Sequence, residues 1–185
     1  ADINRRTIAM ASAIERRAFS STSYLRAGAA LLSTQEEVTS TLFRRFVEEL
    51  RLDSNFRGAE GIGWAPSIMA PEVPAFEERL SEGRVSDVEI TPSLAARPRP
   101  TLVPILYLKP DTLRNRRALG YDMYSEPVRR AAMDLAEREQ RPIASGRIVL
   151  VQEGGGDEPG FIIYMPVFDA SGSGQDLKGF IYSPF

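Results

Sequence analysis

The chain has 185 residues, with 43% hydrophobic and 26% charged side chains, and its 23 basic residues nearly balance its 25 acidic ones. This composition indicates one globular domain or two small ones, and it argues against a disordered chain or a strongly basic nucleic-acid binder. The sequence contains no cysteine and no histidine. It therefore lacks the side chains for Cys/His zinc sites, thiol nucleophiles, Ser-His-Asp triads and histidine pH switches, and we expect no cofactor.

No apolar run reaches the ~20 residues that a helix needs to cross a bilayer, and the first residues are not typical of a signal peptide. The chain stops at Phe185 within a segment whose pattern predicts a strand. We therefore expect it to be a piece of a larger protein.

Glycine and proline divide the chain into a helical part and a strand-and-turn part. Residues 1–57 contain one glycine, Gly28, and no proline, whereas residues 58–185 contain 13 of each. This distribution predicts helices in the first third. Two overlapping capping boxes, Ser33 with Glu36 and Thr34 with Glu37, predict that one helix ends near residue 32 and that a second begins there.

The first predicted helix is unusually long. About 30 residues at 1.5 Å each give a rod of ~45 Å, which is longer than a domain of this size needs, so part of it must project. Its stripe of apolar residues is interrupted by polar ones, which predicts a weak dimer seam rather than a strong coiled coil. The alternative is a solvated helix that lies along one subunit.

The elements after residue 57 are short. The patterns predict helices at 74–80 and 127–140, and strands at 61–65, 89–91, 102–108, 148–151, 161–168 and 178–182. The strands at 148–151 and 161–168 form a predicted hairpin across Gly154-Gly155-Gly156-Asp157. This order of elements predicts an α+β fold with an antiparallel sheet, the layout of PAS-type sensor domains among others.

Residues 115–127 form the segment richest in chemically active side chains, and Asp122 lies in it between aromatic and sulfur-containing residues. An ionised carboxylate away from water needs a hydrogen-bond donor. A bound ligand with N–H groups could be that donor. Alternatively, Asp122 accepts bonds from backbone amides in a turn ahead of the next helix.

Other candidate motifs have simpler interpretations. Residues 154–156 lack the Lys-Ser or Lys-Thr of a phosphate-binding loop, so they indicate a hairpin turn. The acidic pairs 48–49 and 77–78 lie on predicted helix surfaces, where solvated ion pairs with nearby arginines are expected. The pairs 116–117 and 129–130 are arginines that could attract an anionic ligand or lipid headgroup, or that serve only solubility.

Several of these segments, taken together, resemble the CHASE sensory domain over residues 55–170. The segments are Gly61-Ile62-Gly63-Trp64-Ala65-Pro66-Ser67-Ile68, Phe76-Glu77, Pro104-Ile105-Leu106-Tyr107, Asn115, Ala118-Leu119-Gly120-Tyr121-Asp122, Pro127-Val128-Arg129-Arg130-Ala131 and Gly160-Phe161-Ile162-Ile163-Tyr164-Met165-Pro166-Val167-Phe168.

The resemblance implies an extracytoplasmic ligand-binding module, held between two transmembrane helices and coupled to a histidine kinase or a diguanylate cyclase inside the cell. It implies a stalk helix and second helix at 1–54, a membrane-distal PAS-like ligand-binding unit at 55–145 and a membrane-proximal PAS-like unit at 146–185. The location implied is the inner membrane, with this domain in the periplasm or outside the cell.

The resemblance also suggests site residues. The Leu-Gly-x-Asp match places the family's ligand-anchoring aspartate at Asp122, and the same alignment places Ala144 at the pocket wall. The family often has a tyrosine where this chain has Leu102. Because of that departure, the cytokinin bound by plant members is not carried over to this chain.

We therefore expect a non-enzymatic sensor of a small-molecule ligand, with a weak homodimer through the first helix and no nucleic-acid partner. One alternative is a dimerisation or protein-docking module without a ligand. The other is an enzyme that uses Asp122 as general base, which the absence of the usual bases and nucleophiles disfavours.

Overall fold

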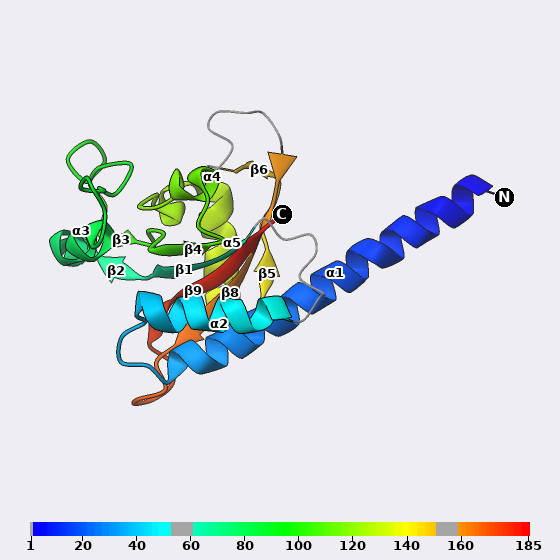
Figure 1. Cartoon of the computed structure of the whole chain (residues 1–185), viewed down its shortest axis with the longest axis horizontal. Helices are drawn as coiled ribbons and strands as arrows, with labels where there is room; N and C mark the ends of the chain where they lie inside the picture. The colour runs from blue at the N-terminus through cyan, green and yellow to red at the C-terminus, as the bar shows by residue number, and fades with distance from the viewer. Residues whose placement is uncertain (1, 53–60, 151–158) are drawn as a thin grey trace.

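The computed structural model describes residues 2–52, 61–150 and 159–185, and it confirms an α+β fold with an antiparallel sheet (Figure 1). The helices are α1 (Asp2–Ser33), α2 (Ser40–Leu52), α3 (Val73–Ser81), α4 (Leu113–Arg116) and α5 (Pro127–Glu139), with short 3-10 turns η1 (Ala70–Glu72) and η2 (Met123–Ser125). The strands are β1 (Ile62–Pro66), β2 (Ile68–Met69), β3 (Thr101–Leu102), β4 (Tyr107–Lys109), β5 (Ile143–Ala144), β6 (Ile148–Val149), β7 (Pro159–Gly160), β8 (Ile162–Phe168) and β9 (Leu177–Pro184).

Five strands form the main sheet in the order β4-β1-β9-β8-β5, and every neighbouring pair is antiparallel. Strands β8 and β9 form its longest ladder, from Ile162 opposite Pro184 to Phe168 opposite Leu177. Strands β1, β4 and β5 precede residue 145, whereas β8 and β9 follow it. The sheet therefore joins both sides of the position where the family resemblance implies a division between two units.

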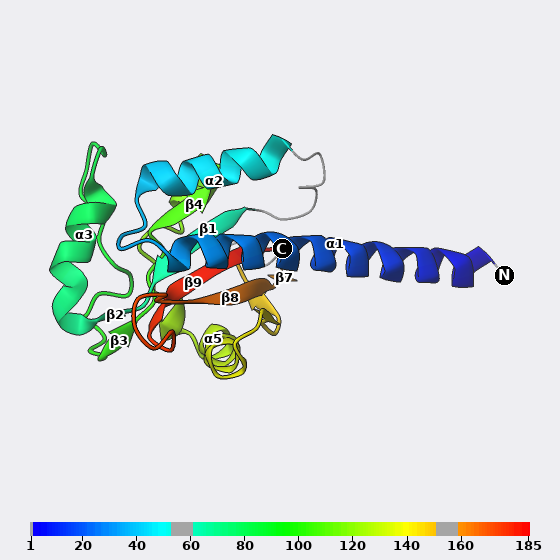
Figure 2. The ribbon, with the colours of Figure 1, turned by 90° about the horizontal axis from the view of Figure 1, so that it is seen from below.

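Helices cover both faces of this sheet (Figures 1 and 2). The C-terminal turns of α1 and helix α2 pack on one face, and α5 packs on the other. Strand side chains alternate between the two faces. On β9, Ile181 therefore belongs to the core under α1, whereas its neighbours Phe180 and Tyr182 belong to the core under α5.

Helix α1 has a buried end and an exposed end. Leu25, Ala29 and Leu32 are buried against the sheet, whereas Ile3 and Met10 are exposed. Figures 1 and 2 show the N-terminal part of the helix extending away from the other elements.

The predicted capping boxes are wrong, because α2 begins at Ser40 rather than directly after α1. The hydroxyls of Ser33 and Thr34 donate instead to carbonyl oxygens of the last turn of α1, each at 2.7 Å. The cap of α2 is Thr39, whose hydroxyl oxygen accepts a bond from the amide of Leu42 at 3.2 Å.

The helices predicted at 74–80 and 127–140 are confirmed as α3 and α5. The hairpin predicted between 148–151 and 161–168 is wrong in its second strand, because β6 pairs with β7, whereas β8 pairs with β5 and β9. The glycine turn of that hairpin, 154–157, lies outside the described residues. The single strand predicted at 102–108 is wrong, since β3 pairs with β2 while β4 pairs with β1. The strand predicted at 89–91 is also wrong, because only Thr91 makes a bridge there, to Tyr121.

The packing of α1 on the sheet depends on Gly28. A Cβ atom at this position would clash with Ile181 Cδ1 and would lie 2.9 Å from Phe46 Cζ. Although alanine has the higher helix propensity, we expect Gly28→Ala to destabilise the domain by about 1–3 kcal/mol, because an added methyl group overpacks this contact. Urea unfolding of the two proteins measures the difference, and a more stable variant would contradict the packing described here.

Candidate functional site

Asp122 is fully buried and directly precedes η2 in the chain. In space it lies next to Val103, the residue that follows β3. Its backbone forms a bridge with Pro104, and its amide donates to the carbonyl of Thr91 at 2.8 Å. Gly120, two residues earlier, has a φ of +84°, which a glycine adopts without strain. The turn at Gly120 thus leads the chain into the interior just before Asp122.

The carboxylate of Asp122 accepts three hydrogen bonds from within the chain. Its Oδ1 atom accepts from the amides of Val103 at 2.8 Å and Tyr124 at 3.0 Å. Its Oδ2 atom accepts from Arg99 Nε at 2.7 Å. A carboxylate offers about four lone-pair positions, so these donors occupy most of its capacity. Asp122 therefore caps η2 and holds Arg99, as the turn-and-cap alternative describes.

Arg99 connects Asp122 to the loop that precedes β3. Only 12% of its side chain is exposed. Besides Asp122, it donates from Nη1 to the carbonyl of Arg97 at 2.5 Å and from Nη2 to the carbonyl of Pro92 at 2.6 Å. Its guanidinium group is thus fixed in place by two backbone carbonyls and one buried charge.

A hollow of about 410 Å³ opens beside this ion pair. That volume is within the range of small-molecule sites. Residues from the loop before β3, from β3, from η2 and from α5 line the hollow: Arg97, Pro98, Arg99, Pro100, Thr101, Tyr124, Ser125 and Arg130. We call it the arginine hollow, because three arginine residues line it.

Tyr124 and Arg130 form one wall of the arginine hollow. Arg130 donates from Nη1 to the carbonyl of Tyr124 at 3.1 Å, and its guanidinium carbon lies 5.8 Å from the centre of the Tyr124 ring. The Tyr124 hydroxyl donates to Asp134 at 2.7 Å. Burial, with this hydrogen bond and the nearby negative charge, raises the pKa of Tyr124 to about 12, so the phenol stays neutral at physiological pH.

The other two residues predicted for the site lie elsewhere. Leu102 is fully buried in the core under α1, and its strand β3 pairs with Ile68 of β2. Ala144 is exposed on β5 and lines a different hollow of about 510 Å³, next to Phe161. Neither residue is among those that line the arginine hollow.

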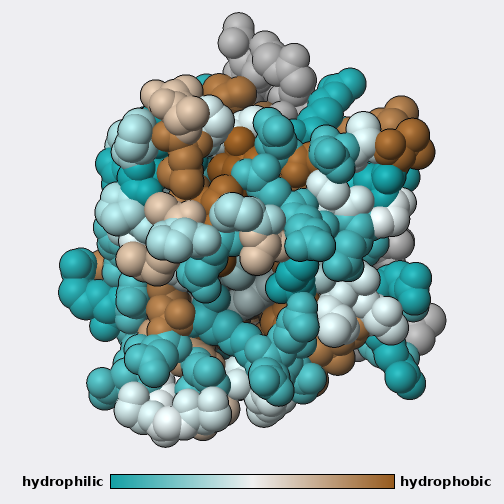
Figure 3. Space-filling model, turned by 90° about the vertical axis from the view of Figure 1, so that its left-hand side faces the viewer, coloured by the Kyte–Doolittle hydropathy of each residue, from teal (hydrophilic) through white to brown (hydrophobic). Residues whose placement is uncertain are grey.

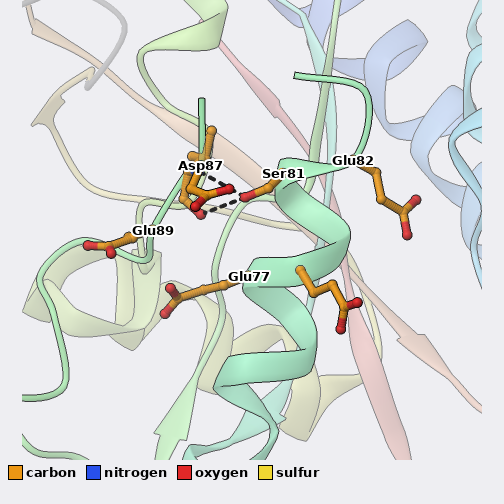
Figure 4. Close-up of a pocket in the computed structure, with 7 residues that line it drawn as sticks. Glu77, Ser81, Glu82, Asp87 and Glu89 are labelled. Carbon is orange, nitrogen blue, oxygen red and sulfur yellow. Dashed lines mark hydrogen bonds between the residues drawn. The ribbon is translucent and has the colours of Figure 1, made fainter. Parts of the chain in front are cut away.

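The exposed end of the molecule around α3 is mostly hydrophilic, with hydrophobic side chains in separate small patches (Figure 3). It carries an acidic hollow of about 440 Å³, formed by α3 and the loop that follows (Figure 4). Burial, followed by repulsion from Glu89, raises the pKa of Glu77. Ser81 closes the loop, because its hydroxyl accepts a bond from the amide of Val88 at 2.9 Å.

Across the described residues, no group of three potential ligands is placed to hold a metal ion.

The adjacent arginines of α5 differ in their surroundings, which the sequence pattern does not reveal. Arg129 is 4% exposed, pairs with Glu126 at 3.1 Å and lies over the Tyr121 ring, whereas Arg130 faces the arginine hollow. Burial favours the neutral form of Glu126. The amides of Val128 and Arg129 and the guanidinium group of Arg129 outweigh it and lower the pKa of Glu126.

The family model of the CHASE domain matches residues 36–185, which are 150 of the 185 residues. The chain belongs to the CHASE family. CHASE domains are extracytoplasmic sensory domains of signalling receptors, and they are not catalytic. No curated protein matches the chain. Among the helices of the described residues, none is both long and apolar enough to span a membrane.

The burial of the Asp122–Arg99 pair leads to a stability prediction. We expect Asp122→Ala to lower the free energy of unfolding by about 3 kcal/mol or more, because it leaves a nearly buried guanidinium group and two amides without their acceptor. Asp122→Asn keeps an acceptor but loses the charge, so its loss should be smaller. Both are measured by urea unfolding.

The matched control is Asp111→Ala, because Asp111 pairs with Arg116 at 2.7 Å but about half of each side chain is exposed. Exposed ion pairs contribute little. If Asp122→Ala were no more destabilising than Asp111→Ala, the buried pair would not have the structural role assigned to it.

Proposed function

We propose that this domain is the extracytoplasmic ligand-binding sensor of a transmembrane receptor and that a small molecule binds in the arginine hollow. The observation that supports this proposal most directly is the fixed Asp122–Arg99 pair beside a hollow of ligand size. Pre-organised polar groups in a concave site are typical of small-molecule recognition. A ligand site of this kind agrees with the sensory role of the CHASE family.

In this proposal Asp122 belongs to the ligand site by holding Arg99 at the wall of the hollow. Leu102 does not line the hollow, but it lies in the chain between the lining residue Thr101 and Val103, whose amide donates to Asp122. Ala144 lines the separate hollow beside β5, so we assign Ala144 no part in binding this ligand.

The arrangement of the elements also provides a route from the hollow to the rest of the domain. Arg130 lines the hollow and belongs to α5, which packs on β8. Strands β8 and β9 contact α1 on the opposite face. A ligand that favours one position of α5 would therefore bias the position of α1, provided its affinities for the two states differ.

For the whole receptor, we propose membrane spans outside this domain, an intracellular histidine kinase or diguanylate cyclase as the output, and a weak homodimer through α1 as the stalk. The exposed side chains of Ile3, Ile8 and Met10 are consistent with a weak contact of this kind. A docking module without a ligand would need no hollow beside Asp122, so a test of ligand binding separates the two functions.

A substitution that fills the hollow tests ligand binding. We expect small molecules that raise the unfolding temperature of the wild type to lose this effect in Thr101→Trp, because the indole would occupy the hollow that Thr101 lines. The control is Thr41→Trp, at an exposed position of α2, which should respond like the wild type. Thermal unfolding against a library of cationic, neutral and anionic metabolites measures both. An equal response of the two variants would exclude the arginine hollow as the site.

The absence of cysteine permits a direct test of location. Val85 is fully exposed, so Val85→Cys introduces a single accessible thiol into the domain. We expect a membrane-impermeant maleimide to label this thiol in spheroplasts that express the full-length protein, with the unsubstituted protein as background. Labelling that requires lysis would place the domain in the cytoplasm and contradict the proposal.

A further inference from the structure

The arginine hollow is lined by three arginines and by no acidic residue. Asp122 compensates Arg99 at 2.7 Å. Arg97 and Arg130 make no ion pair with any carboxylate of the described residues, and none of the residues that line the hollow is acidic. Arg97 and Arg130 therefore contribute two guanidinium charges that no carboxylate of the described residues pairs directly, although Asp134 lies near Arg130 through its bond to Tyr124. The whole chain has a net charge of −2.

The guanidinium groups of Arg99 and Arg130 are also held in place before any ligand binds. Arg99 has five N–H donors, and its bonds to Asp122, Arg97 and Pro92 use three of them, one on each nitrogen. One N–H group therefore remains on Nη1 and one on Nη2. Arg130 is fixed by its bond to the Tyr124 carbonyl and by the Tyr124 ring. Little side-chain entropy would be lost when a ligand binds to groups that are already ordered.

These features indicate the chemical class of the ligand. Guanidinium groups bind carboxylates through paired N–H donors, and charge-assisted bonds of this kind are stronger than neutral ones. The rings of Pro98, Pro100 and Tyr124 give the hollow apolar walls that suit the carbon skeleton of an organic molecule. Asp122 has most of its acceptor positions filled by the chain, so it offers little to a ligand that carries N–H donors.

We infer that the arginine hollow binds a small organic carboxylate, whose anionic group is held by Arg97, Arg130 and the two remaining N–H groups of Arg99. This inference rests on the proposed function, because it names the ligand class for the same site. Asp122 acts here as a positioning residue, since it contacts the ligand only through Arg99.

Nuclear magnetic resonance of the domain with isotope-labelled arginine tests the inference. The probes are succinate and benzoate, with succinamide and benzamide as uncharged counterparts of the same shape. We expect both carboxylates to shift the Nε–H signals of Arg97, Arg99 and Arg130, whereas the amides should not. The signal of Arg117, which is exposed and lies outside the hollow, should not move.

Substitutions show whether the binding depends on these side chains. Arg97→Ala and Arg130→Ala should each weaken binding of the carboxylates about tenfold or more, as expected for loss of a charge-assisted bond. Arg117→Ala removes the same charge from an exposed position and should leave the affinity within about twofold, which excludes a general effect of net charge. Equal losses in all three variants would overturn the inference.

Two further results would overturn the inference, and each has a distinct meaning for the proposed function. If the amides bind as well as the carboxylates, the ligand is not selected by its charge, but the hollow is still a small-molecule site. If neither class shifts the arginine signals, the carboxylate inference is wrong, and the proposed function is then decided by whether Thr101→Trp blocks a library compound that Thr41→Trp does not.

Discussion

A buried carboxylate has to find its hydrogen-bond donors within the chain, and the way in which Asp122 does so organises the region between β3 and α5. It takes the amides of Val103 and Tyr124 and the Nε–H group of Arg99. These bonds interrupt strand pairing after β3, start η2 and fasten the preceding loop to the interior. The arginine hollow is a by-product of the same arrangement, because the loop and η2 form two of its walls.

The sequence predicts the chemical need at Asp122 but not its partner. Aromatic and sulfur-containing neighbours indicate that the carboxylate is shielded from water, and its position before a helix indicates a turn. Arg99 lies 23 residues earlier, in a loop with no periodic pattern, so nothing in the sequence distinguishes it from the other arginines. The same limit applies to Arg129 and Arg130, whose different burial depends on which way α5 faces the sheet.

Errors in the predicted elements have equally local causes. The apolar run at 102–108 has the composition of a strand, but the amide of Val103 bonds the Asp122 side chain and the amide of Ile105 bonds the Tyr121 carbonyl, so neither joins the ladder expected of a strand. The motif at 33–37 has the spacing of a capping box, but its hydroxyls serve the helix that ends rather than the one that follows. Helices α3 and α5 were predictable because their apolar spacing and first-turn prolines agree.

Strand β9 lies between the two cores, and this position has a thermodynamic consequence. Consecutive residues, Phe180, Ile181 and Tyr182, belong alternately to the core under α5 and to the core under α1. Neither core can lose its packing without moving a strand that the other core needs. The domain should therefore unfold in one cooperative transition, in which the heat of unfolding measured by calorimetry equals the van't Hoff value, because no intermediate can keep one face of the sheet intact.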